Sequence, residues 1–448
     1  MEQAKTARIW ITSLLMAALV AFYGYWLVTE TPAYWETFLF VTLLFLLFVI
    51  ALIRFVPYLQ IYLATGSEPH LERVGDRTYR RCGVRELAKV ILLIVLLRLL
   101  QMLLTYLIHL YLFGYTDTFL TVQRLWLDFF HAEYTFPAYP LLSNIFWFVS
   151  FNFNHARFLA SYAFTALAGA TLYYWTLLDF DRPVARRVLL YFFLMPASCL
   201  LLGTLPDSLL LLFSLLCLMF ARKKRFVLGN IFAMLAVMTH IFGVLLFVPN
   251  IIGFIEKLIA DLNEHRDEEK GYLIRQILTA VSFLLIPLGF AAVMLYSRIQ
   301  FGSSTALFRT AMDAYGYELS TPFHSVAALV DRFLTAMHTL EGEALLKELG
   351  TVIPNMVYLV IGGVLLVFAS GRIRTSYIAY MLVAYTAVLC TGTVSEAPRL
   401  LSICVPFVLT LSLVTKQKWL HRLLYVLSFI VFLLYLTAVV GGYTHYGR

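Results

Sequence analysis

Apolar runs of about twenty residues recur along the whole chain, and this recurrence restricts the fold more than any other feature of the sequence. The first three runs cover residues 9–28, 37–57 and 86–113. A helix needs ~20 apolar residues to cross a bilayer. The chain is 61% hydrophobic and 13% charged, whereas soluble domains carry about 25% charged residues. The sequence therefore predicts an all-α, polytopic helical membrane protein rather than a water-soluble globule.

Counting each apolar run as one crossing predicts about 13 transmembrane helices. The runs cover residues 9–28, 37–57, 86–113, 157–178, 187–203, 207–221, 226–239, 241–258, 275–297, 353–369, 375–393, 399–415 and 422–441. The two short runs on either side of His240 could instead form one broken helix. Residues 137–152 are apolar but short and begin with a Phe136-Pro137-Ala138-Tyr139-Pro140 turn, which favours an interfacial helix over a crossing.

The basic residues indicate which way the helices run. With the N-terminus in the cytoplasm, most of the 34 Lys and Arg residues fall in cytoplasmic segments, among them 73–89, 222–225 and 257–275. Cytoplasmic loops of membrane proteins carry such an excess. We therefore expect a multi-pass plasma-membrane protein with a cytoplasmic N-terminus and two long outer loops, 114–156 and 298–352. The net charge of +8 then belongs to these cytoplasmic loops, and no nucleic-acid partner is expected.

The chain lacks the sequence signatures of several classes of protein. The chain contains no P-loop GxxxxGK[ST] and no dinucleotide-binding GxGxxG motif, so an ATP-driven pump or a cytosolic nucleotide-sugar site is not supported. Its five cysteines are scattered, without a CxxC pair or a His/Cys cluster. Neither a disulfide framework nor a zinc site is therefore predicted. We expect polar chemistry on the extracytoplasmic face.

The first outer loop carries charged residues beside aromatic ones. Asp117, Arg124, Asp128 and Glu133 lie there, with Trp126 two residues before Asp128. Aromatic side chains offer apolar faces to a sugar or lipid headgroup, and a carboxylate can act as a general base on a hydroxyl. An aromatic belt with solvated charges at the membrane surface is the plainer interpretation of the same pattern.

Isolated polar residues elsewhere are further candidates. Arg399 lies at the outer mouth of a predicted helix, where a guanidinium either snorkels or clamps a lipid phosphate. Asp207 begins a predicted helix and His240 lies at an outer turn, so each could serve structure alone. Arg98 lies in mid-span, where we expect a buried polar partner. Arg309 is a cation of the second outer loop.

The second half of the second outer loop has helical periodicity. Over residues 325–346, apolar residues recur at Val326, Leu329, Phe333 and Met337. This spacing predicts an amphipathic helix that either lies on the bilayer or caps a cavity.

Three motifs, taken in order, resemble one known family. They are Phe136-Pro137-Ala138-Tyr139-Pro140-Leu141-Leu142; Pro206-Asp207-Ser208 with the basic turn 222–225 and the run from Gly229 to Thr239-His240 and Gly243; and Pro398-Arg399-Leu400 with Pro406. This pattern is similar to the PIG-V-like mannosyltransferases of the GT-C superfamily. The resemblance covers about residues 86–441 and implies a GT-C-like transmembrane domain over 64–448, with two additional N-terminal transmembrane helices over 1–63.

The resemblance implies a function on the outer face. Such enzymes transfer a sugar from a polyprenyl-phosphate donor, here to a cell-envelope lipid, glycan or protein. Asp128 is the position nearest the catalytic aspartate of the family, and Asp117 is its rival. Arg399 would hold the leaving phosphate, helped by Arg124 or Arg309. Further substrate-binding positions are implied in the motifs and the first outer loop: Asp207, Tyr139, His240 and Glu133.

The chain also departs from the family pattern. The family has Trp and Asp adjacent, whereas Leu127 separates Trp126 from Asp128, and His240 stands where the family has arginine. An inactive GT-C-like subunit of a polysaccharide synthesis or secretion complex, with other membrane subunits as partners, and a lipid-linked glycan transporter are therefore alternatives. A divalent metal ion is left open, because some relatives use one; Asp117, Asp128 and Glu133 could supply oxygen ligands, but their spacing matches no recognisable metal loop.

Overall fold

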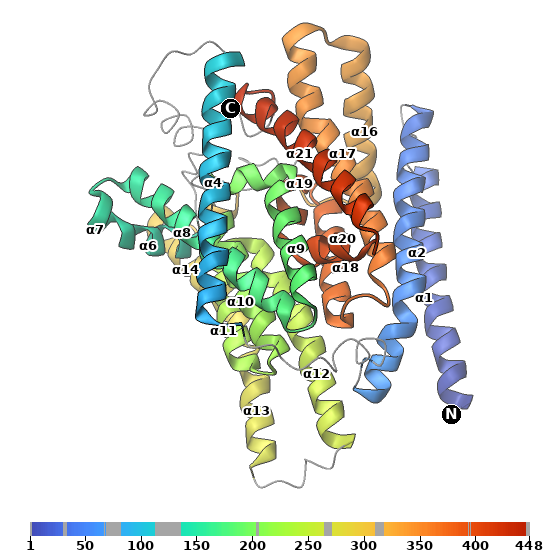
Figure 1. The fold of residues 1–448 in the computed structure, drawn as a ribbon. Helices are drawn as coiled ribbons and strands as arrows, with labels where there is room; N and C mark the ends of the chain where they lie inside the picture. Colours follow the sequence, from blue (N-terminus) through green and yellow to red (C-terminus); the bar gives the residue numbers. More distant parts are fainter. Residues whose placement is uncertain are drawn as a thin grey trace.

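The computed structural model describes residues 2–29, 34–66, 68, 82–112, 136–202, 206–263, 271–309, 318–392, 394 and 396–444. Within these ranges the secondary structure is helical and no strand is present. The helices gather into one bundle in which the N-terminal pair lies at one side and α4 at the other (Figure 1). The predicted all-α class is confirmed.

Six helical segments of the described chain are long and apolar enough to cross a membrane. They are Trp35–Thr65 (α2), Val84–Leu112 (α4), Ile241–Asn263 (η3 with α12), Tyr272–Phe301 (α13 with α14), Gly342–Ala369 (α17) and Lys418–Val440 (α21). Lengths of 23 to 31 residues exceed the ~20 that a bilayer requires. The chain therefore has the helices of a multi-pass membrane protein.

The other predicted crossings correspond to helices that are shorter or less apolar than these six. Phe226–Val237 (α11) and Thr375–Leu389 (α18) are short apolar helices. Arg182–Leu194 (α9) has 13 residues and Asp207–Arg222 (α10) has 16. Phe153–Leu177 (α8) has 25 residues but is not among the six segments. The count of 13 crossings therefore stays a prediction.

The N-terminal pair is packed into the bundle. After α1 (Glu2–Thr29), α2 packs against α17, α12, α18 and α16 (Pro322–Thr339). Thr37 of α2 donates a hydrogen bond of 2.5 Å to Asp331 of α16, and Leu47 lies against the glycine face of α17 at Gly363. The residues predicted as an N-terminal addition thus share the core of the remaining chain.

Helix α16 stands alongside the first half of α17 (Figure 1). Val326 and Leu329 of its predicted apolar face are buried, whereas Met337 is exposed. The amphipathic helix predicted from their spacing is therefore present, and most of its apolar face packs against α2 and α17.

Three helices are interrupted in the middle of the bundle. Helix α9 ends before Pro196 and continues as the 3-10 helix η2 (Pro196–Leu202), and α19 (Ala397–Ile403) gives way to α20 (Pro406–Leu413). Proline removes a backbone donor and clashes with the preceding turn, so neither helix continues through it. Helix α11 ends at Val237, and η3 (Ile241–Leu246) leads into α12 (Phe247–Asn263). The break predicted at His240 is confirmed.

The segment predicted to be interfacial is a chain of short turns. It comprises α6 (Ala138–Ser143), the 3-10 turn η1 (Asn144–Phe146) and α7 (Trp147–Ser150), and it projects from the side of the bundle near the start of α8 (Figure 1). Thirteen helical residues rise about 20 Å at most, less than the ~30 Å hydrocarbon thickness. The segment is therefore not a crossing.

Charged residues meet at the end of the bundle where α10 stops. This far-end charge network contains three carboxylates, three cations and a tyrosine: Glu68, Asp179, Glu256, Arg222, Lys224, Arg374 and Tyr62. Its members come from α2, the chain after it, the α8–α9 turn, the α10–α11 turn, α12 and the start of α18. The network therefore ties segments far apart in sequence to one another.

The contacts within the far-end charge network are short. Asp179 accepts from Arg222 at 2.7 Å and from Arg374 at 3.0 Å, and Lys224 lies 2.9 Å from Glu256. Burial alone would raise the pKa of Asp179, but the guanidinium groups of Arg374 and Arg222 outweigh it and lower that pKa. Asp179 is therefore ionised in the folded chain.

Candidate functional site

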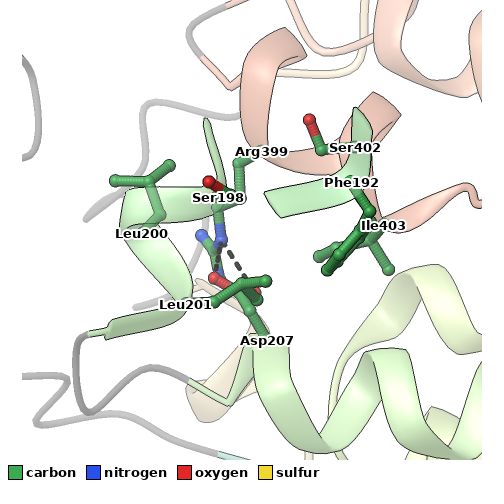
Figure 2. Close-up of a pocket in the computed structure, with 8 residues that line it drawn as sticks. All are labelled: Phe192, Ser198, Leu200, Leu201, Asp207, Arg399, Ser402 and Ile403. Atoms are coloured by element: carbon green, nitrogen blue, oxygen red, sulfur yellow. Dashed lines mark hydrogen bonds and ion pairs between the residues drawn. The ribbon is translucent and has the colours of Figure 1, made fainter. Parts of the chain in front are cut away.

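Arg399, Asp207 and Glu396 form a buried ionic cluster. The Nε of Arg399 donates to both oxygens of Asp207 at 2.7 and 2.9 Å, and its Nη1 donates to both oxygens of Glu396 at 2.9 and 3.0 Å. The three side chains are at most 1% exposed. Figure 2 shows the guanidinium above Asp207 with the dashed bonds between them. Charges buried this deeply are stable only when paired.

The interruptions of the helices bring this cluster together. Asp207 is the first residue of α10, Glu396 is the N-cap residue of α19, and Arg399 lies in the first turn of α19. The amide of Ala397 donates to Asn355 of α17 at 2.8 Å, which fixes where α19 begins. Acidic side chains at helix N-termini are also favoured by the helix dipole. Two helix ends thus place two carboxylates around one guanidinium.

Glu396 is a member of the cluster that sequence reasoning did not single out. It lies three residues before Arg399, a spacing that puts two side chains on one face of a helix. That spacing was the available signal. Asp207 and Arg399 were both predicted as site residues from the sequence, and the structure brings them into direct contact across 192 positions.

His240 lies beside the cluster as a neutral group. It is buried, and its Nδ1 accepts a hydrogen bond from the amide of Phe242 at 3.2 Å. Burial, followed by the positive charge of Arg399, lowers the pKa of His240 to about 3. The imidazole therefore carries no charge at neutral pH and acts here as a hydrogen-bonded turn residue.

Tyr139 lies close enough to the cluster for the charge of Asp207 to act on it. Its side chain is 1% exposed, and its hydroxyl donates to the backbone carbonyl of Arg157 at 3.3 Å. Burial raises its pKa; the charge of Arg157 lowers it and that of Asp207 raises it further. The hydroxyl is therefore protonated and able to donate a hydrogen bond.

Phe136 and Ala138, in the segment predicted as the first outer loop, contact the turn of His240 beside this cluster. Phe136 lies with its ring 6.2 Å from that of His240, and the amide of Ala138 donates to the carbonyl of Met238 at 3.0 Å. The four predicted site residues of that loop lie outside the described residues: Asp117, Arg124, Asp128 and Glu133. The chain that carries them therefore ends against the turn of His240.

Arg309 lies near the same place but outside the cluster. Its side chain is exposed, and its neighbour Phe308 packs edge-on against Phe136 at 5.5 Å. Arg309 is therefore placed at the rim, beside the end of the first outer loop, and does not contact Asp207 or Glu396.

A small cavity touches the ionic cluster. It is lined by Phe192, Ser198, Leu200, Leu201, Asp207, Arg399, Ser402 and Ile403, as Figure 2 shows. Its volume of about 10 Å³ is room for one water molecule. In the part of the chain that the structure describes, no group of three or more His, Cys, Asp or Glu is arranged to hold a metal ion.

Arg98 lies behind this cavity. It donates to Thr165 at 3.0 Å, to the carbonyl of Leu201 and, at 3.5 Å, to that of Ser198. The two carbonyls belong to η2, whose C-terminal end attracts a positive charge. The expected buried polar partners are thus Thr165, Gln101 and the end of η2, and Arg98 holds the wall of the cavity in place.

The chain matches no protein-family model, no curated protein and no solved structure. The likeness to PIG-V-like mannosyltransferases therefore rests on the sequence motifs alone. The fold brings together a guanidinium held by two carboxylates, a neutral imidazole and a buried phenol, with Phe136 beside the imidazole.

Proposed function

We propose that this protein is an integral membrane glycosyltransferase of the GT-C type. It transfers a sugar from a polyprenyl-phosphate donor to a cell-envelope lipid, glycan or protein acceptor. The observation that supports this proposal is that two of the family-like motifs, those of Asp207 and Arg399, meet in one buried cluster, and that Phe136 of the predicted first outer loop lies against the neighbouring His240. Interrupted helices inside a bundle are tolerated where they line a site.

The proposed chemistry places the base on the first outer loop. Asp128 removes the proton from an acceptor hydroxyl as that oxygen attacks the anomeric carbon of the sugar. The bond between that carbon and the phosphate oxygen breaks, and the lipid phosphate leaves with the bonding electrons. Asp117 is the alternative base. A lipid-borne donor of this kind requires no cytosolic nucleotide pocket.

The motif implies that Arg399 holds the leaving phosphate, but its two carboxylate partners favour a different role. A guanidinium already held by two carboxylates has less charge to offer a phosphate than an unpaired one. In the proposed mechanism Arg399 therefore orients Asp207 and Glu396 toward the sugar hydroxyls, and the leaving phosphate contacts other cations. Arg124 and Arg309 stay in this proposal as such contacts.

The proposal includes an arrangement in the membrane. About 13 helices cross the plasma membrane, the N-terminus is cytoplasmic, and transfer occurs on the extracytoplasmic face. A divalent ion, should the reaction use one, would be held by oxygen ligands of the first outer loop.

Substitution of Asp128 tests the proposed function. The purified full-length protein in proteoliposomes is given polyprenyl-phosphate mannose and a membrane extract as acceptor, and transfer of labelled sugar is measured. We expect Asp128→Asn to reduce transfer by about 100-fold or more, since general bases contribute about 10²–10⁴ in rate. Asp117→Asn serves as the matched variant. Full transfer by both single variants and by the double variant would contradict the assignment of either base.

A transporter of lipid-linked glycans is the second candidate. Buried charges at interrupted helices also build the substrate sites of transporters, and the Asp207–Arg399–Glu396 cluster has this form. The two candidates differ in one measurement. A transporter moves a fluorescent lipid-linked glycan across the membrane of proteoliposomes, and its Asp128→Asn variant moves the glycan equally well. An enzyme does not move the glycan across the membrane. An inactive subunit of a larger complex would show no transfer, and its cellular function would survive both aspartate substitutions.

A further inference from the structure

Arg157 is a cation near the cluster that has no carboxylate partner among the described residues. It lies in the second turn of α8, its backbone carbonyl accepts the hydroxyl of Tyr139, and its charge acts on that same phenol. Its Nε is buried and meets no hydrogen-bond acceptor. A buried guanidinium nitrogen without an acceptor is costly unless a ligand supplies one.

The segment leading to Arg157 presents a continuous apolar surface. We call residues 138–153 the aromatic hairpin. Its outward side chains are large, apolar and between 57% and 76% exposed: Leu141, Ile145, Phe148, Val149, Phe151 and Phe153. Phe151 has a φ of 52°, a left-handed conformation that turns the chain back toward α8 and is unusual for a bulky residue.

The surroundings of the aromatic hairpin indicate what covers it. The hairpin packs along α8, whose Leu159 and Leu167 are also exposed, and α8 packs against the membrane-crossing length of α4. Its exposed apolar side chains therefore lie beside a candidate membrane-crossing helix, and clustered exposed apolar side chains mark a surface that lipid or another protein covers. Figure 1 shows the hairpin projecting from the bundle on the side of α4.

The two faces of the aromatic hairpin differ. Ala138, Tyr139 and Ser143 are buried against the protein. The charge of Asp207 contributes to raising the pKa of the Tyr139 phenol. The opposite face carries the exposed apolar side chains. The aromatic hairpin thus has one exposed apolar face and one face buried toward the ionic cluster, and Arg157 follows it in α8.

We infer that the aromatic hairpin and Arg157 form a binding site for a long-chain lipid phosphate. The hydrocarbon chain of the lipid lies along Phe148 and Phe151 in the bilayer, and the guanidinium of Arg157 pairs with the lipid phosphate beside Tyr139. This inference deepens the proposed function, on which it rests for the identity of the donor as a lipid phosphate. It gives the phosphate a cation that no carboxylate of the described residues neutralises, in contrast to Arg399.

Binding without any sugar transfer tests the phosphate contact. The dissociation constant of undecaprenyl phosphate, which carries no sugar, is measured with the full-length protein in nanodiscs. We expect Arg157→Gln to weaken binding by about 10-fold or more, as the loss of one charge-assisted pair does, and Arg157→Lys to retain most of it. Arg298→Gln, an exposed arginine at the end of α14, is the matched control. Unchanged binding by Arg157→Gln, or equal weakening by the control, would overturn the assignment.

The length of the lipid tests the aromatic hairpin. Phe148→Ser combined with Phe151→Ser should weaken the binding of undecaprenyl phosphate several-fold. The binding of the short-chain farnesyl phosphate should be unchanged, because only the long chain reaches the hairpin. The same pair of changes at the exposed Leu427 and Ile430 of α21 should affect neither lipid. Equal loss for both lipids, or none, overturns the role of the hairpin. Wild-type protein that binds no lipid phosphate overturns the whole inference, while sugar transfer still decides the proposed function separately.

Discussion

At the scale of a single residue, the structure gives a physical reason for a neutral histidine at position 240. A cation at position 240 would lie buried within the field of Arg399, whose charge already lowers the pKa of His240. A neutral imidazole avoids this repulsion and still accepts the amide of Phe242. A neutral residue at position 240 therefore suits a site in which Asp207 and Glu396 both contact one guanidinium.

The lowered pKa of His240 predicts a dependence of stability on pH. With a folded pKa of about 3 against about 6.5 in an unfolded chain, the unfolded state binds a proton that the folded state does not. The stabilisation is complete above about pH 6.5 and falls by at most about 1.4 kcal/mol per pH unit below it. His240→Asn, which keeps an acceptor for Phe242, should flatten the fall in unfolding midpoint between pH 7.5 and 4.5.

Thermal unfolding in detergent at several pH values provides the measurement. Other groups titrate in both proteins, so the difference between the two profiles isolates position 240. Parallel profiles would show that the imidazole is charged in the folded state or exposed to water.

Four residues at or beside the ionic cluster have a local signal in the sequence, but the contacts between them do not. Asp207, Arg399, Tyr139 and His240 each carry a local signal: a helix start, a helix mouth or a motif. Contact between Asp207 and Arg399 depends on how distant helices pack. No period or spacing in the sequence contains that information, and Glu396 was missed because its partner was unknown.

At the scale of elements, the turn between α11 and η3 depends on a glycine. A Cβ added at Gly243 would lie 2.3 Å from the backbone of Ala236 and Val237. The close approach of two backbone segments there holds His240 between them. Only a residue without a side chain permits this contact.

Gly243→Ala should therefore displace η3 from α11 and disturb the site. We expect a loss of about 1–3 kcal/mol in unfolding free energy, as overpacking of a buried position causes, together with a large fall in sugar transfer. Gly24→Ala in α1, where no atom lies within 4 Å, is the matched control and should leave both unchanged. Wild-type unfolding and transfer by Gly243→Ala would show that the turn is not held by this contact.

The apolar runs predicted where helices occur better than they predicted the lengths of those helices. Every long apolar segment of the six was predicted as a crossing, and the break at His240 was anticipated. The run 187–203 and the run 399–415, taken as single crossings, are each divided by a proline. Hydropathy does not register such a break, because proline changes the hydrogen bonding of a helix and hardly its polarity.

At the scale of the whole molecule, the orientation is the prediction most open to test. Ser303 precedes the turn that packs on Phe136, whereas Arg225 lies at the end of the bundle where α10 stops, and both are exposed. In a variant with the five native cysteines replaced, Ser303→Cys should react with a membrane-impermeant maleimide in intact cells. Arg225→Cys should react only after permeabilisation. The reverse pattern would place the ionic cluster on the cytoplasmic side.

The far-end charge network has a consequence for how this protein is made. Arg222, Lys224 and Arg374 are matched in the folded chain by Glu68, Asp179 and Glu256. On a nascent chain those acidic partners are still distant, so the basic turn after α10 presents its full charge to the insertion machinery, which responds to local Lys and Arg. We therefore expect the same cations to act twice: first as a retention signal during biogenesis, and afterwards as neutralised cross-links that hold the inserted helices in register.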